Sequence, residues 1–235
     1  MAGLESDRLI IPYGCATVAG PAAAASHHVI IVPARRRPLR LYDGDWRFAE
    51  PPNPARLAGS GAALGVLREH LKRLCDPWAA SQGRFVDGYF AVLAARVAQA
   101  APALRARLAR FGDLYRIEDF GFSALAPLPR AHLADADGWI AVDSAFWTGA
   151  ALVAIDIADT RRPRRRRAAD HARLAAAGAE IVALAPEALG DPGALARSLP
   201  AALVDFLDGE TLPASPFKAV ALGAIVDAGA TPEHD

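Results

Sequence analysis

Residues 138–186 constrain the fold of this chain most, because they carry signals for two strands, a helix and a third strand in close succession. Apolar segments at Trp139–Phe146 and Ala151–Ile157 have the length and composition of short strands. The residues between them, Trp147-Thr148-Gly149, end in a glycine that is typical of a hairpin turn. This stretch therefore predicts an antiparallel strand pair.

The segment after the hairpin has the signals of a helix with defined ends. Asp159 or Thr160 can cap its first turn, and Pro163 is compatible with that turn. Gly178 stands where a glycine cap at the C-terminus of the helix is expected. Residues 179–185 (AEIVALA) then predict a buried strand that returns to the sheet.

Helices are also predicted on both sides of this unit. Apolar residues at helical spacing predict helices at 61–74 and 85–98, and Pro102 predicts the start of another one that runs to residue 111. Residues 115–128 are expected to supply the first strand of the sheet, kept short by the prolines that follow. Residues 191–207 predict a helical region that an internal proline kinks or divides.

The N-terminal part of the chain is predicted to be rich in β-structure. Residues 8–48 contain a β-branched run, and their Asp43-Gly44 pair is typical of a hairpin turn between alternating segments. Residues 51–54 (PPNP) break regular structure and are interpreted as a connector. The predicted organisation is an N-terminal β-rich extension at 1–54, an α/β core at 55–212 and a partly disordered C-terminal segment at 213–235.

The phrase VDSAFWTGAALVAIDIAD, followed by an arginine-rich helix, LAAAG and a strand, resembles the restriction-endonuclease-like PD-(D/E)XK superfamily. It is most similar to the branch of the very-short-patch-repair endonucleases, over roughly residues 112–190. The resemblance implies an α/β fold of restriction-endonuclease-like type, with the order α-β-β-β-α-β. It also implies a metal-dependent nuclease in which Asp143 and Asp156 are the catalytic acids and together bind Mg²⁺ or Mn²⁺.

The sequence departs from that pattern two positions after the second acid, where Ala158 replaces the basic residue of the motif. Strand alternation places Asp156 and Ala158 on the same face. A neighbouring arginine cannot take over the role of a base, because it stays protonated. A second interpretation of the acids is therefore structural, with Asp143 as a polar residue at a strand end and Asp156 as a buried acid paired with an arginine.

Two further acids and one histidine are candidates for the same site. Asp159 or Glu118 is a possible source of a third carboxylate. His171 lies close to the basic run and is able to face the site, although helix packing is the more ordinary role of such a residue. His27 and His28 are adjacent in a predicted strand and point to opposite faces, so they are poor joint ligands for one metal.

The run RRPRRRR at 161–167 is the main basic feature of the chain. Positive charge at the start of a helix opposes the helix dipole, and this favours an anionic partner over a merely solvated surface. We therefore expect phosphate contacts from this run. The predicted nucleic-acid-binding residues are Arg161, Arg162, Arg164, Arg165, Arg166 and Arg167.

Composition limits the remaining possibilities. The chain has 26 basic and 26 acidic residues, so an affinity for nucleic acid must come from a local patch. Cys15 and Cys75 form no paired spacing, and no export signal or membrane segment is evident, so a cytoplasmic protein is expected. The predicted function is a metal-dependent nuclease, or a degenerate nuclease-fold protein that acts on or binds nucleic acid. The alternative is a non-catalytic protein-interaction or assembly protein that retains the fold.

Overall fold

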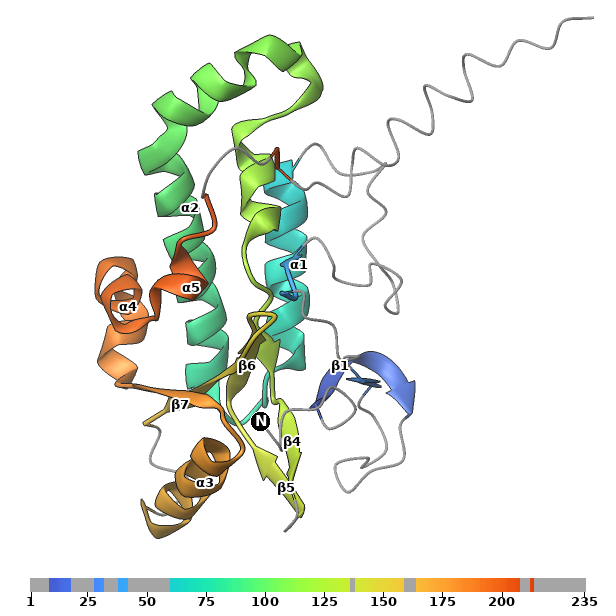
Figure 1. Cartoon of the computed structure of the whole chain (residues 1–235), viewed down its shortest axis with the longest axis vertical. Coiled ribbons are helices and arrows are strands. Elements are labelled where there is room, and N and C mark those ends of the chain that lie inside the picture. Colours follow the sequence, from blue (N-terminus) through green and yellow to red (C-terminus); the bar gives the residue numbers. More distant parts are fainter. Residues whose placement is uncertain are drawn as a thin grey trace, which may run out of the picture.

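The computed structural model of the chain, shown in Figure 1, describes residues 9–17, 28–31, 38–41, 60–135, 138–158, 164–207 and 212–213. These residues form two four-stranded β-sheets together with helices. The predicted α/β class is therefore confirmed. The turn predicted at Asp43-Gly44 lies outside the described residues.

The sheet at whose end both predicted acids lie has the strand order β3 (Leu128–Pro129), β6 (Ser144–Trp147), β7 (Leu152–Ile157) and β8 (Glu180–Leu184). The pairs β3–β6 and β6–β7 are antiparallel, whereas the pair β7–β8 is parallel. A parallel connection needs a crossover, and α3 (Arg164–Ala176) supplies it. The predicted hairpin, helix and returning strand are thus present in the predicted order.

The second sheet has the order β2 (His28–Ile31), β1 (Leu9–Thr17), β4 (His132–Asp135) and β5 (Gly138–Ala141), with antiparallel pairing throughout. The two N-terminal strands confirm β-structure in the predicted extension. They do not form a sheet of their own, because β1 pairs with β4 of the core. The extension and the core therefore share one sheet.

The predicted strand at Trp139–Phe146 is divided into β5 and β6, because this part of the chain serves both sheets. Main-chain hydrogen bonds continue across the division, from Arg130 N to Asp143 O (3.0 Å) and from Val142 N to Ala131 O (2.9 Å). Arg130 adopts a positive φ of 53° at this point. The ribbon therefore bends immediately beside Asp143.

The long helix of the core corrects one prediction. α1 (Ser60–Leu74) forms as expected, but α2 (Ala80–Leu108) is a single helix that contains Pro102, so Pro102 does not begin a separate helix. Proline removes the hydrogen bond to the carbonyl four residues earlier, which here belongs to Ala98. Both residues are exposed, so water can bind that carbonyl and the helix continues.

Residues 115–128 correct a second prediction, because half of them form the 3₁₀ helix η5 (Ile117–Ser123) instead of a strand. Another such helix, η4 (Ala109–Leu114), precedes it. The main-chain N–H of Arg116 donates to the Asp119 carboxylate (2.9 Å) and so stabilises the start of η5. Only the two residues of β3 are left to pair with β6.

The C-terminal ends of the elements follow their local signals. Gly178 has a φ of 81° and donates to Ala175 O, while Ala179 N donates to Leu174 O, which closes α3 with the predicted glycine cap. Beyond β8 and η6 (Pro186–Gly190), the predicted helical region is divided at Pro200. Its two parts are α4 (Pro192–Ser198) and α5 (Ala201–Val204).

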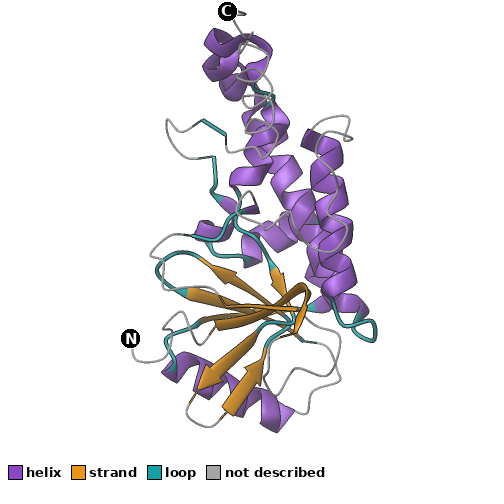
Figure 2. Cartoon of the chain, turned by 90° about the vertical axis from the view of Figure 1, so that its right-hand side faces the viewer, coloured by secondary structure: helices purple, strands orange, loops and turns teal. Residues whose placement is uncertain are grey.

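The core lies between α2 and the sheet that contains β7. Phe146 of β6 packs edge-on against Phe85 and Tyr89 of α2, with ring centroids 6.2 Å and 5.0 Å apart. All six residues of β7 are buried, as expected for a strand covered on both faces. Figure 2 shows the second cover, with α3 on the opposite side of the strands from α1 and α2.

Candidate functional site

Asp156 is the penultimate residue of β7 and is only 7% exposed. Its Oδ2 atom lies 2.9 Å from His171 Nε2 and 3.1 Å from Arg167 Nε, both on α3. Residues four apart share one face of a helix, so both side chains reach the sheet from the same side. Arg167 Nη2 also donates to Ile157 O at 3.4 Å. The acid therefore fastens α3 to the end of β7.

Asp143 lies at the bend immediately before β6, and both of its carboxylate oxygens accept hydrogen bonds. Oδ1 accepts from Gln82 Nε2 at 3.0 Å, and Oδ2 accepts from the main-chain N–H of Ile157 at 2.8 Å. That N–H lies where the ladder between β6 and β7 ends, since Ser144 pairs with Ile155. The carboxylate thus replaces a main-chain carbonyl as the acceptor.

The structure brings the two predicted acids to the same end of the sheet. Continuing the register of β6 and β7 places Asp143 opposite Asp156. The donors around them are nitrogen groups, however, and no three His, Cys, Asp or Glu side chains in the described part of the chain are placed to hold a metal ion. A hard cation such as Mg²⁺ requires oxygen ligands that are free to bind it. These side chains do not fit a metal site as arranged, so the predicted metal stays a prediction.

The other residues considered for this site lie in different places. Ala158 is exposed just beyond β7, and its main-chain N–H donates to Leu184 O (2.8 Å). Glu118 lies on η5, next to the stretch of α2 that carries Val97. Because α2 rises 1.5 Å per residue, the helix between Gln82 and Val97 spans roughly 20 Å, so Glu118 cannot supply a third carboxylate. Asp159 lies outside the described residues.

Gln82 is a site residue that the sequence reasoning missed. It is 6% exposed, accepts from the main-chain N–H of Asp76 through Oε1 (2.9 Å) and donates to Asp143 through Nε2. It therefore links the turn between α1 and α2 to the end of the sheet. Its signal in the sequence is a polar residue in line with the buried Phe85 and Tyr89 of the same helix.

The arginines of the run at 161–167 differ in their contacts and in their exposure to solvent. Arg167 is directed at Asp156, whereas Arg165 and Arg166 are exposed on the first turn of α3. α3 has no acidic residue in its first turn to offset this charge. Arg161 and Arg162 lie outside the described residues, and the structure does not describe the Arg164 side chain. Arg165 and Arg166, two of the predicted nucleic-acid-binding residues, are therefore accessible to solvent.

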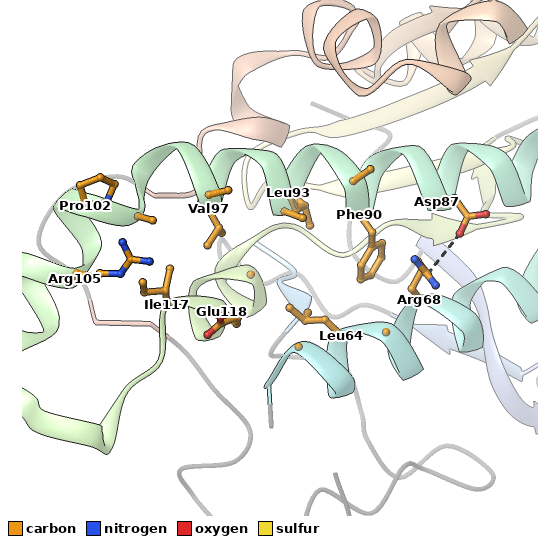
Figure 3. A pocket seen from close by; sticks show the side chains of 17 residues that line it. Leu64, Arg68, Asp87, Phe90, Leu93, Val97, Pro102, Arg105, Ile117 and Glu118 are labelled. Atoms are coloured by element: carbon orange, nitrogen blue, oxygen red, sulfur yellow. Dashed lines mark ion pairs between the residues drawn. The ribbon is translucent and has the colours of Figure 1, made fainter. Parts of the chain in front are cut away.

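A groove of about 700 Å³ lies between α1, α2 and η5 (Figure 3). Its walls are mainly apolar and include Leu64, Phe90 and Val97, and the ion pair between Arg68 Nε and Asp87 Oδ1 (3.5 Å) closes one end. Of the residues considered for the site, only Glu118 lines this groove. Nothing among the described residues indicates what would occupy it.

Comparison with known proteins adds no relative, because no protein-family model, curated protein or solved structure matches the chain. In the described ranges, no helix combines the length and the apolar character that crossing a membrane requires. The function is therefore inferred from the geometry at the shared end of β6, β7 and α3.

Proposed function

We propose that this chain is a non-catalytic protein of restriction-endonuclease-like architecture that binds nucleic acid through the start of α3. The order of its core elements supports this architecture: α2, the antiparallel strands β3, β6 and β7, the crossover helix α3, and the parallel strand β8. The predicted acids lie at adjacent strand ends within this order. The additional strands β4 and β5 lie between β3 and β6 in the chain and pair with each other, so they leave the order of the core elements unchanged.

The observation that carries the proposal is the pairing of Asp156 with Arg167 and His171. In a metal-dependent site, this carboxylate would be free to bind the cation. Here it neutralises part of the basic helix and holds it against the sheet. With alanine at position 158, the site also lacks a basic side chain beside the acid on its own strand. The geometry thus supports binding better than hydrolysis.

The exposed charge on α3 supplies the reason for an anionic partner. Arg165 and Arg166 are exposed close to the N-terminus of the helix, where the dipole makes positive charge unfavourable. A phosphate backbone would relieve this repulsion and would release bound counterions. Such contacts position the protein on nucleic acid without reading its sequence.

The binding test is fluorescence anisotropy with labelled DNA and RNA, titrated at several salt concentrations. On duplex DNA, the Arg165→Ala, Arg166→Ala double variant should reduce the slope of log K against log salt by about 1.8, close to 0.9 for each lost phosphate contact. The matched control is Arg105→Ala, Arg110→Ala, which removes two exposed arginines from the far end of the molecule. Equal slopes in the wild type and the α3 variant would contradict the proposal.

A cleavage assay tests the non-catalytic part of the proposal. The wild type and an Asp143→Ala, Asp156→Ala double variant are incubated with single- and double-stranded DNA and RNA in Mg²⁺ or Mn²⁺. We expect no cleavage by either protein. Metal-dependent cleavage by the wild type that is lost in the folded double variant would show that both acids are catalytic, and would overturn the proposal.

A further inference from the structure

Trp78 is the most exposed large apolar side chain in the described part of the molecule. It is 75% exposed, whereas Leu114 and Leu212 are 48% and 38% exposed. Tryptophan has a large apolar ring surface that is normally packed against other groups in a folded protein. Such a side chain in open solvent is therefore a candidate contact for a partner.

The turn that carries Trp78 is held in place by hydrogen bonds. The main-chain N–H of Trp78 donates to Asp76 Oδ1 at 2.9 Å, and that of Ala79 donates to Asp76 O at 2.9 Å. Asp76 N in turn donates to the buried side chain of Gln82. The backbone beneath the indole is thus fixed before any partner binds, which lowers the entropy cost of binding.

The same turn is connected to the start of α3 by a continuous series of contacts. Gln82 donates to Asp143, Asp143 accepts from the N–H of Ile157, and the preceding Asp156 pairs with Arg167. α3 begins near this end of the sheet, because it follows the C-terminal end of β7 and crosses back to the parallel strand β8. Figure 1 agrees, with α3 below the lower ends of α1 and α2.

From this arrangement we infer that Trp78 stacks on an unpaired nucleobase, so that the partner is a single-stranded nucleic acid whose phosphates contact Arg165 and Arg166. This inference rests on the proposed function and narrows its substrate class. The indole presents a flat face, and every nucleobase has a complementary face. In a duplex these faces are covered by neighbouring base pairs, whereas in a single strand they are accessible.

The charge of the surface argues for nucleic acid as the partner. An apolar protein partner would use Trp78 but would gain nothing from the two exposed arginines at the start of α3. A duplex would use the arginines but would leave the indole in water. A single strand uses both features at once, since it combines phosphates with accessible bases.

The test compares the wild type, Trp78→Ala and Trp78→Phe in anisotropy titrations with a labelled single strand, the blunt duplex of equal length, and an abasic single strand. We expect Trp78→Ala to weaken binding of the single strand roughly tenfold and binding of the duplex less than twofold. Trp78→Phe should restore most of the affinity, because it keeps an aromatic face. The abasic strand should bind more weakly to the wild type and be insensitive to Trp78→Ala.

The outcomes separate this inference from the proposed function. If the wild type binds none of these probes with salt-dependent affinity, the proposed function itself fails. If it binds them but Trp78→Ala leaves single-strand affinity unchanged, or weakens single strand and duplex equally, only the stacking role is overturned. Unfolding curves of the Trp78 variants provide the folding control, and we expect them to match the wild type because the side chain is exposed.

Discussion

The substitution Asp156→Ala separates a structural acid from a catalytic one by its effect on stability. The Asp156 side chain is 9% exposed and pairs with Arg167, which is 20% exposed, and with His171. Removing one member of a buried ion pair costs about 3–5 kcal/mol, because the remaining charge stays desolvated. Arg167 keeps some contact with water and with Ile157 O, so we expect a loss near the lower end, about 3 kcal/mol.

The assay is urea unfolding at neutral pH, followed by linear extrapolation of the unfolding free energy. Asp170→Ala is the matched control, because Asp170 is on the same helix and no ion pair joins it to the described residues. We expect this control to stay within about 0.5 kcal/mol of the wild type. A cycle that combines Asp156→Ala with Arg167→Ala should give a coupling free energy of about 1–3 kcal/mol.

One result would refute the reasoning directly. If Asp156→Ala is as stable as the wild type or more stable, the carboxylate is not an anchor for α3. A buried acid that can be removed without loss of stability is held at its position against its own desolvation cost, which is typical of residues kept for binding or catalysis. The metal-binding interpretation of Asp156 would then become the better one.

Three further predictions concern the core. Gly88→Ala should lose about 1–3 kcal/mol of stability in the same unfolding assay, because its new Cβ would lie 2.9 Å from a main-chain oxygen of η6. Gly83→Ala is the control: its Cβ would meet open space, so this variant should gain up to about 1 kcal/mol. Tyr89→Phe should cost about 1–2 kcal/mol, because its hydroxyl contacts two buried carbonyl oxygens at 2.9 Å and 3.2 Å; equal stability would contradict this role. Burial raises the pKa of the Cys75 thiol from 9.0 to about 12, so in a Cys15→Ser variant a thiol reagent at pH 8 should react only after unfolding. This raised pKa also means that stability falls as pH increases from about 9 towards 12, which alkaline unfolding curves would show.

Local signals predicted the elements whose ends they determine. Gly178 closes α3 because a left-handed residue is needed there, and Pro200 divides the last helical region because it cannot continue a helix. The prediction that Pro102 begins a separate helix is wrong, because the local sequence does not determine whether this proline ends a helix. Its effect depends on whether the carbonyl one turn earlier is exposed to water, and that is a property of the packed structure and not of the local sequence.

The strand expected at 115–128 failed because tertiary packing decided the conformation. Phe120 and Phe122 are buried within η5, and a Cβ at Gly121 would lie 2.6 Å from Leu64 of α1. An aromatic and apolar composition is common to strands and to buried helical turns, so it cannot distinguish them. Packing against both α1 and α2 therefore selects the helical turn.

The site shows the same division between local and long-range information. The proximity of Asp143 and Asp156 follows from a hairpin whose turn is recognisable in the sequence. Their partners do not follow, because Gln82 is 61 residues away from Asp143 along the chain. The role of a carboxylate depends on which donors face it, and such donors are brought together only by the fold.

The contact that fastens α3 also determines which arginines are available. Arg167 and His171 lie on one face of the helix because they are four residues apart, and Asp156 directs that face to the sheet. Successive helical residues are rotated by about 100°, so Arg165 and Arg166 are turned away from Asp156 and into solvent. One buried acid thus neutralises a single arginine of the run and leaves its neighbours free to bind an anion. The carboxylate that the family resemblance assigns to a metal would serve nucleic-acid binding through the orientation of this helix.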